Sequence, residues 1–286
     1  MKRCSICKKA EYCGAECQKA GWKQHKKTCA PPLDANSVLQ KLSAALEVSD
    51  WREVLKWEGR MEELMSGQPA AMQESILAIF STAHHYGLNA TGSKDHAVSI
   101  VRLDEQRVEL LGNMERFRDQ GSCLCNLADY MCGQGKEKEG EQCYQRARDI
   151  GAAHGFFLLE CTSCLGLGHI AMRQGRHEEA VLLLQNALAA APLCEGSAAV
   201  IVLREMDVLQ SLTDALFVTN SVDEVEPLVE RYRSLFKPGM TGDKRTPPFK
   251  LHYLFVSARI HEVLSISIPA GAAPCHCAAL TFPHGR

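Results

Sequence analysis

Five of the fourteen cysteines of this 286-residue chain fall within its first 29 residues. They form a Cys-x2-Cys pair, a Cys-x3-Cys pair and, with a histidine, a His-x3-Cys pair. A tetrahedral Zn²⁺ needs four thiolate or imidazole ligands from at least two backbone segments, and such spacings supply them. The predicted complete site is Cys4, Cys7, His25 and Cys29. So short a module has little apolar core, so we expect its folding to depend on one structural, non-catalytic Zn²⁺ per chain.

The sequence from Cys4 to Cys29 resembles the second part of a MYND zinc finger, with every ligand spacing in place. Gly21 departs from the family, which usually has Asp there. The family also has an upstream Cys-x2-Cys pair, which joins the residues matching Cys13 and Cys17 on a second zinc ion, and this chain starts too late to contain it. The resemblance implies that Cys13 and Cys17 are an orphaned half-site and that the chain holds one metal ion rather than two.

Other interpretations of Cys13 and Cys17 stay open. The two residues could be reduced thiols spaced one turn apart on a helix. They could also share a metal ion between two chains, or belong to a longer natural protein of which this sequence is a fragment.

MYND fingers bind short proline-containing peptides, and Gln18 and Trp22 match the family positions that contact them. The chemistry is suitable, because an indole offers a flat apolar surface to proline and an amide can hydrogen-bond a peptide backbone. The alternative is that Trp22 packs on the small core of the finger.

Beyond the finger the sequence has helical periodicity. Prolines in residues 30–37 predict a stiff linker, because proline ends a helix and cannot continue it. Apolar residues such as Leu39, Leu42 and Leu46 then recur at three- and four-residue steps, and strand patterns are nearly absent. We predict an all-α fold, with antiparallel helix pairs over residues 38–264. Residues 265–286, rich in Ala, Pro and Gly, are expected to be disordered.

The clearest helix pair is predicted over residues 161–192. Gly168 and Ala180 would let two helices approach closely, Gly175 lies in the turn, and Leu184 fills the space between the helices. This spacing resembles the tetratricopeptide repeat (TPR). Related patterns occur at residues 123–152 and 204–238, whereas residues 38–66 and 70–115 match the repeat poorly.

Cysteines and histidines of the helical region are interpreted as structural. Cys161-x2-Cys164 has the spacing of a metal knuckle, but both residues fall at packing positions of a repeat helix. His84 and His85 are expected to be exposed at the end of a helix. The same packing role is predicted for Cys123, Cys125, Cys132 and Cys143.

The sequence favours binding over catalysis. Residues 1–29 carry eight Lys or Arg against two Glu, but zinc-bound thiolates offset this charge, so nucleic acid is not the expected partner. SET–MYND lysine methyltransferases need a β-rich catalytic domain with an Asn-His segment. Residues 33–120 have a helical pattern and no Asn-His pair. The carboxylate-binding form of a TPR groove needs Lys or Arg on the first helices, which these repeats lack.

We therefore predict a zinc-binding adaptor whose finger and helical groove recognise peptide segments of proteins. It is not predicted to be an enzyme, to bind a small-molecule substrate or to contact a membrane. The alternatives are a fragment of a SET–MYND-like methyltransferase and a nucleic-acid-associated transcriptional co-regulator. Many cysteines and no secretory signal favour an intracellular location, in the cytoplasm or the nucleus.

Overall fold

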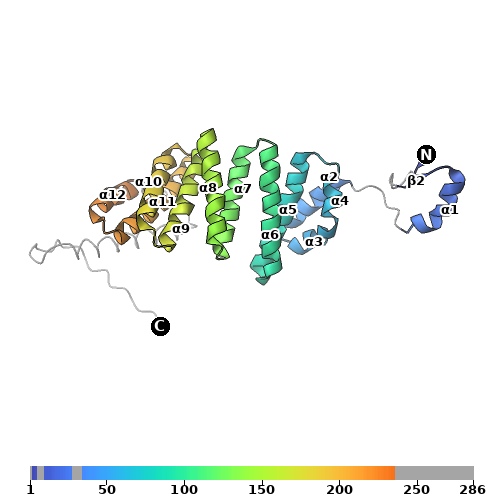
Figure 1. Cartoon of the computed structure of the whole chain (residues 1–286), viewed down its shortest axis with the longest axis horizontal. Helices are drawn as coiled ribbons and strands as arrows, with labels where there is room; N and C mark the ends of the chain where they lie inside the picture. The colour runs from blue at the N-terminus through green and yellow to red at the C-terminus, as the bar shows by residue number, and fades with distance from the viewer. Residues whose placement is uncertain (1, 5–9, 28–33, 236–286) are drawn as a thin grey trace, which may run out of the picture. The chain divides into compact units, whose positions relative to one another are not determined.

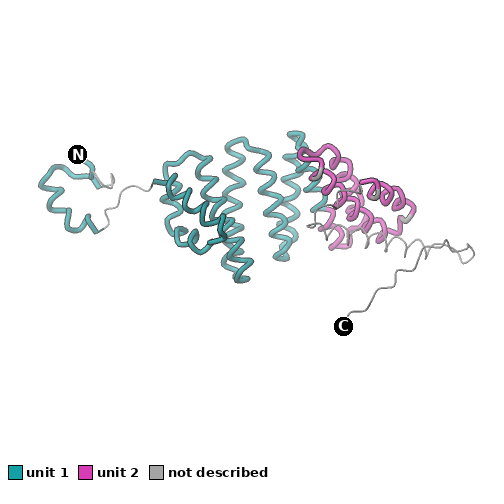
Figure 2. The backbone as a smooth tube through the Cα atoms, turned by 180° about the vertical axis from the view of Figure 1, so that it is seen from behind, with its two compact units in different colours: residues 1–167 teal, residues 168–286 magenta. Residues whose placement is uncertain are grey.

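The computed structural model describes residues 2–4, 10–27 and 34–235 (Figure 1). The expected ligands Cys7 and Cys29 lie outside these residues, as do residues 30–33 of the predicted linker and the tail 265–286. The chain divides into two compact units, Met1–Leu167 and Gly168–Arg286 (Figure 2). Within the described ranges, no helix combines the length and apolar character needed to cross a bilayer.

The N-terminal finger consists of a short hairpin and one helix. Strands β1 (Lys2–Arg3) and β2 (Glu11–Tyr12) pair antiparallel, with Lys2 opposite Tyr12. Helix α1 (Ala15–His25) follows at once. The Arg3 Nε donates a 2.9 Å hydrogen bond to Glu11 Oε1 across the hairpin. The two side chains are largely exposed, so this ion pair adds little stability.

The rest of the first unit is helical, and α2 begins inside the segment predicted as a linker. Its elements are α2 (Ala35–Glu47), α3 (Trp51–Leu55), the 3-10 turn η1 (Glu58–Arg60), α4 (Met61–Met65), α5 (Ala70–Thr91), α6 (Lys94–Asn113), α7 (Phe117–Gly133), α8 (Glu137–His154) and α9 (Phe157–Arg173), which continues into the second unit.

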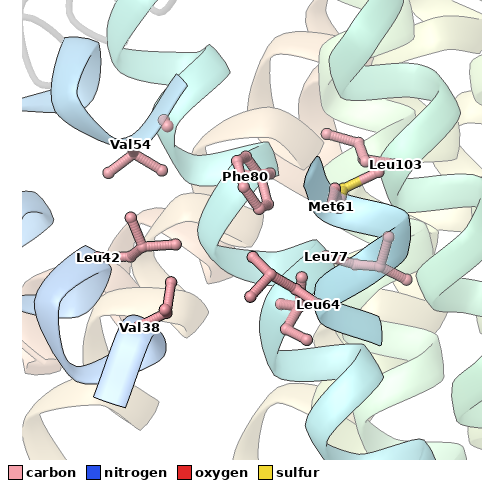
Figure 3. Packing of buried hydrophobic residues seen from close by; sticks show 10 residues of the cluster. Val38, Leu42, Val54, Met61, Leu64, Leu77, Phe80 and Leu103 are labelled. Carbon is pink, nitrogen blue, oxygen red and sulfur yellow. The ribbon is translucent and has the colours of Figure 1, made fainter. Parts of the chain in front are cut away.

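The first helices of the array close on one apolar cluster around α5. The Phe80 side chain is fully buried. In Figure 3 it lies between Leu42 and Val54 on one side and Met61 and Leu103 on the other. These residues come from α2, α3, α4 and α6. Residues of four helices therefore pack around one buried ring of α5, and this burial stabilises their association with α5.

Helices α5 and α6, like α7 and α8, form antiparallel pairs joined by tight turns. Gly92 ends α5 in a left-handed conformation (φ +67°), and its N–H donates a 2.7 Å bond to Leu88 O. Gly135 takes the same left-handed role between α7 and α8 (φ +75°). Glycine occupies this conformation without the steric cost of a Cβ, so both turns follow from the sequence.

The second unit continues with the end of α9, α10 (His177–Ala190), η2 (Ala191–Leu193), α11 (Ala198–Val218), η3 (Val222–Glu224) and α12 (Val225–Leu235). A Cβ on Gly168 would stand 2.8 Å from Leu184 Cγ, so only glycine allows this approach of α9 to α10. The Leu184 side chain is fully buried there. The predicted small-residue contact and the turn at Gly175 (φ +74°) are both confirmed.

The prediction for His84 was wrong. Helix α5 continues past it to Thr91, and only 4% of the residue is exposed. His84 Nε2 lies 3.1 Å from Glu58 Oε1, and His84 Nδ1 lies 2.9 Å from His96 Nδ1. Both contacts are satisfied if a neutral His84 donates through Nε2 and accepts from His96. His85 makes a 4.0 Å contact with Asp104 Oδ2.

Replacing Phe80 tests the apolar cluster of Figure 3. Phe80→Ala leaves a cavity where four helices meet and should lower the free energy of unfolding by about 3–5 kcal/mol. Urea titration followed by far-UV circular dichroism measures this change. Val48→Ala, at a side chain that is 76% exposed, is the control and should change stability by less than about 0.5 kcal/mol. Equal effects of the two substitutions would contradict the assigned core.

The buried His84 predicts a loss of stability in acid. Burial lowers the pKa of His84 below its ordinary value of 6.5. Just below pH 6.5 the imidazole is therefore protonated in the unfolded chain but still neutral in the folded chain. This contribution to stability is present above pH 6.5 and is lost as the pH falls below it. Urea midpoints measured between pH 7.5 and 5.5 should therefore decline, and His84→Asn should reduce the slope. An identical slope in both proteins would refute the assignment.

Candidate functional site

Tyr12 holds together the two ends of the finger. The Cys4 side chain is 1% exposed and packs against Tyr12. The His25 ring at the end of α1 meets the Tyr12 ring edge-on, with centroids 6.0 Å apart. The Cys4 N–H donates a 2.8 Å bond to Ala10 O, which closes the segment between the two strands. A thiol and an imidazole predicted as ligands thus share one aromatic neighbour.

The other two predicted ligands, Cys7 and Cys29, lie outside the described residues. Among residues 2–4, 10–27 and 34–235, no three potential metal ligands come together. Helix α1 ends at His25 and a turn follows at Lys26 and Lys27, so the described helix stops before Cys29. Two of the four donors are described, a buried thiol and an imidazole beside one tyrosine, and these donor types fit Zn²⁺.

Cys13 and Cys17 form a separate, exposed pair. Cys13 lies in the bend before α1 rather than on the helix, and Cys17 lies in its first turn. The Cys13 thiol hydrogen-bonds to the Cys17 sulfur and its own pKa is raised by that bond. Hydrogen bonds from the Cys13 backbone and side chain lower the pKa of Cys17. The two thiols therefore lie within hydrogen-bonding reach of each other.

Gln18 and Trp22 lie four residues apart on α1 and so share one face of the helix. The Trp22 residue is 36% exposed, and its ring is tilted against His25 with centroids 5.7 Å apart. Gln18 is half-buried. One side of the indole therefore packs on a predicted zinc ligand, while part of the ring stays open to solvent.

The cysteines of the helical array are structural, as predicted. Cys161 and Cys164 are 0% and 5% exposed. Burial raises the pKa of Cys123 to about 12, so its thiol stays protonated at neutral pH. Cys125 and Cys143 are also buried, and Cys132 is half-buried. Buried thiols of this kind are poor nucleophiles and poor metal ligands.

Sequence reasoning missed a cavity of about 420 Å³ along α6 and the C-terminal end of α7. The side chains that matter most for its chemistry are Lys94, Val98, Val101, Arg102, Met131 and Lys136. The available signal was a second apolar stripe on α6, at Ala97, Val98 and Val101, next to the buried stripe that contains Ile100 and Leu103. We refer to this feature as the α6 cavity.

Comparison with known proteins assigns the two parts of the chain. Residues 1–29 match the family model of the MYND finger. The crystal structure of BtubC (BKLC) from P. vanneervenii has a TM-score of 0.53 with this chain at 12% identity, and the alignment covers 94% of each chain. The structure of a Podosopora anserina protein, described as a kinesin light chain with nearly identical TPR-like repeats, has a TM-score of 0.44 at 17% identity. That alignment covers 77% of this chain and 97% of the other. No curated protein matches the sequence.

The class that follows is a zinc-finger protein with a helical repeat array. Residues 1–29 are a MYND finger, and the helices of residues 34–235 are TPR-like. MYND fingers bind zinc, so Zn²⁺ is expected. MYND fingers generally mediate protein–protein interactions, so residues 1–29 point to an interaction module.

Proposed function

We propose that the chain is an adaptor whose MYND finger and helical array each recognise peptide segments of partner proteins. The observation that carries this proposal is Trp22, which packs one side on His25 and keeps about a third of its surface open. The part of the indole that does not pack on His25 is available to a partner, and tryptophan is a frequent anchor of protein interfaces. We propose that a partner protein covers this part of the ring.

In this proposal Cys4, Cys7, His25 and Cys29 hold one structural Zn²⁺. The protein supplies all four ligands, so no coordination position is left for a water molecule or a substrate. Tyr12 positions two of the donors, because it packs on Cys4 and meets the His25 ring. The metal would fix α1 against the hairpin and with it the orientation of Trp22.

Gln18 and Trp22 are the proposed peptide-contacting residues. The open part of the indole provides a flat apolar surface for a proline ring, and the Gln18 amide can both donate to and accept from a peptide backbone. Gln18 stands one helical turn before Trp22, so the two side chains would reach adjacent residues of an extended peptide.

The proposed layout is a finger at residues 1–29 followed by a helical array whose first described helix begins at Ala35, inside the segment 30–37 predicted as a linker. The proposed location is intracellular, in the cytoplasm or nucleus. Buried, protonated thiols such as Cys123 and Cys164 suit a reducing compartment, because they pack as small apolar groups there.

Metal content tests the zinc site. Protein purified under reducing conditions should contain one tightly held Zn²⁺ per chain, measured by mass spectrometry of the metal. Cys29→Ser should lose this ion because three ligands cannot retain a structural zinc ion, while the far-UV helicity of the array is retained.

The matched control is Cys132→Ser, which removes a half-buried thiol of α7 and should leave the zinc content unchanged. Two firmly bound ions per chain would show that Cys13 and Cys17 complete a second site. Retention of zinc by Cys29→Ser would show that the ligand assignment is wrong.

Peptide binding tests the face that contains Trp22. Trp22→Ala should weaken the binding of fluorescently labelled proline-containing hexapeptides by roughly 30-fold, the size expected for loss of about 2 kcal/mol at a central aromatic contact. Trp22→Phe should recover part of the affinity, because a flat apolar ring remains. Lys23→Ala, at the neighbouring exposed position, should bind like the unaltered protein. Unchanged binding by Trp22→Ala with full zinc content would remove Trp22 from the peptide site.

A further inference from the structure

The α6 cavity has the size and lining of a ligand site, and it lies entirely within the first compact unit. Its volume of about 420 Å³ falls within the range of about 300–1,000 Å³ usual for small-ligand pockets. It is separate from the finger. It is also separate from the groove expected along the first helices of the pairs, because most of its lining comes from α6, the second helix of its pair.

Helix α6 is apolar on two faces. Ile100 and Leu103 point into the core and are fully buried. Val98 and Val101 line the cavity instead, and Val98 is 68% exposed, although valine is usually a buried residue. Met131, buried at the end of α7, completes an apolar wall. Nothing in the described part of the chain covers Val98, so the wall is open to a ligand.

The charge around this wall is mainly positive. Lys94 and Lys136 are exposed, and neither forms an ion pair with another described residue. The Arg102 guanidinium lies 3.3 Å from Glu58 Oε1 and shares that carboxylate with His84. Glu105 is the acidic side chain among the lining residues. Because Glu58 balances Arg102, the two lysines face Glu105 alone, which leaves a small positive excess at the cavity in a protein with a net charge of −2.

We propose that the α6 cavity binds a short acidic peptide segment of a partner protein, with one apolar side chain on the Val98–Val101 wall and flanking carboxylates near Lys94 and Lys136. A small inorganic anion would satisfy the lysines but leave the apolar wall uncovered. Nucleic acid would need a longer basic surface than one cavity provides. Only a ligand with adjacent apolar and acidic groups uses both features. This inference rests on the proposed protein-binding function but not on the finger.

The test uses the full zinc-loaded chain and two peptides that carry a neutral dye. One peptide has the core Asp-Leu-Glu-Val-Asp, and the other replaces each acid with its amide. Fluorescence anisotropy should show binding of the acidic peptide, at least tenfold weaker binding of the amide peptide, and weakening by salt, because screening reduces attraction between exposed charges.

Charge reversal identifies the site. Lys94→Glu combined with Lys136→Glu should weaken acidic-peptide binding at least tenfold. Lys138→Glu makes the same change per residue, −2 against −4 for the pair, at an exposed residue outside the cavity and should weaken binding less than twofold. Val98→Ser should weaken binding without changing its salt dependence. These exposed substitutions should leave the thermal unfolding midpoint unchanged.

A second readout places the peptide directly. In the methyl spectrum of ¹³C-methionine protein, the Met131 signal, assigned with Met131→Leu, should shift when the acidic peptide is added. The Met61 signal should not shift, because Met61 lies in the buried cluster of Figure 3.

Several outcomes would overturn the proposal. They are no binding at about 1 mM peptide (a free energy of about −4 kcal/mol), equal binding of the amide peptide, equal loss with Lys138→Glu, and displacement by single-stranded DNA at lower concentration than by acidic peptide. Trp22→Ala should leave acidic-peptide binding intact. Failure of the finger as a peptide site is therefore distinguishable from failure of the α6 cavity.

Discussion

The close approach of paired helices is the constraint on which the array depends, because each pair can bury its apolar faces only against its partner and its neighbours. In two helix pairs, a glycine on one helix lies opposite a side chain of the next helix, which allows the close approach. Leu184 of α10 packs onto Gly168 of α9, where a Cβ would lie 2.8 Å from Leu184 Cγ. His96 of α6 packs onto Gly87 of α5, where a Cβ would lie 2.7 Å from His96 Nε2. The second contact is polar, and through it His96 reaches His84.

This difference explains how far the array could be predicted from the sequence. Residues 161–192 were predicted as a helix pair because their contact is made by small and apolar residues at regular spacing. Residues 70–115 matched poorly, yet α5 and α6 form an equally close pair. Their interface is partly made by buried polar groups. The Arg107 guanidinium bonds Glu74 Oε1 at 2.9 Å, and His84 bonds His96. A buried, paired polar side chain looks in the sequence like an exposed one, so the position of His84 could not be predicted.

The candidate sites also differ in whether the sequence alone could reveal them. Ligand spacing revealed the finger, because metal coordination imposes short, fixed intervals on the chain. The role of Tyr12 could not be found by spacing, since it depends on packing against Cys4 and His25 in three dimensions. The α6 cavity was missed because its cations come from α6 and from the turn after α7. Only folding brings Lys94 and Lys136 to one opening.

The two proposed peptide sites together would have a consequence that neither site has alone. The finger face at Trp22 would take a proline-containing segment, and the α6 cavity would take an acidic one. A partner that carries both segments meets the second site at an effective concentration set by the linker, in the millimolar range for short flexible linkers. Overall affinity can then exceed that of either site by about 10²–10⁴-fold. The spacing of the two segments in the partner would then decide which proteins bind tightly.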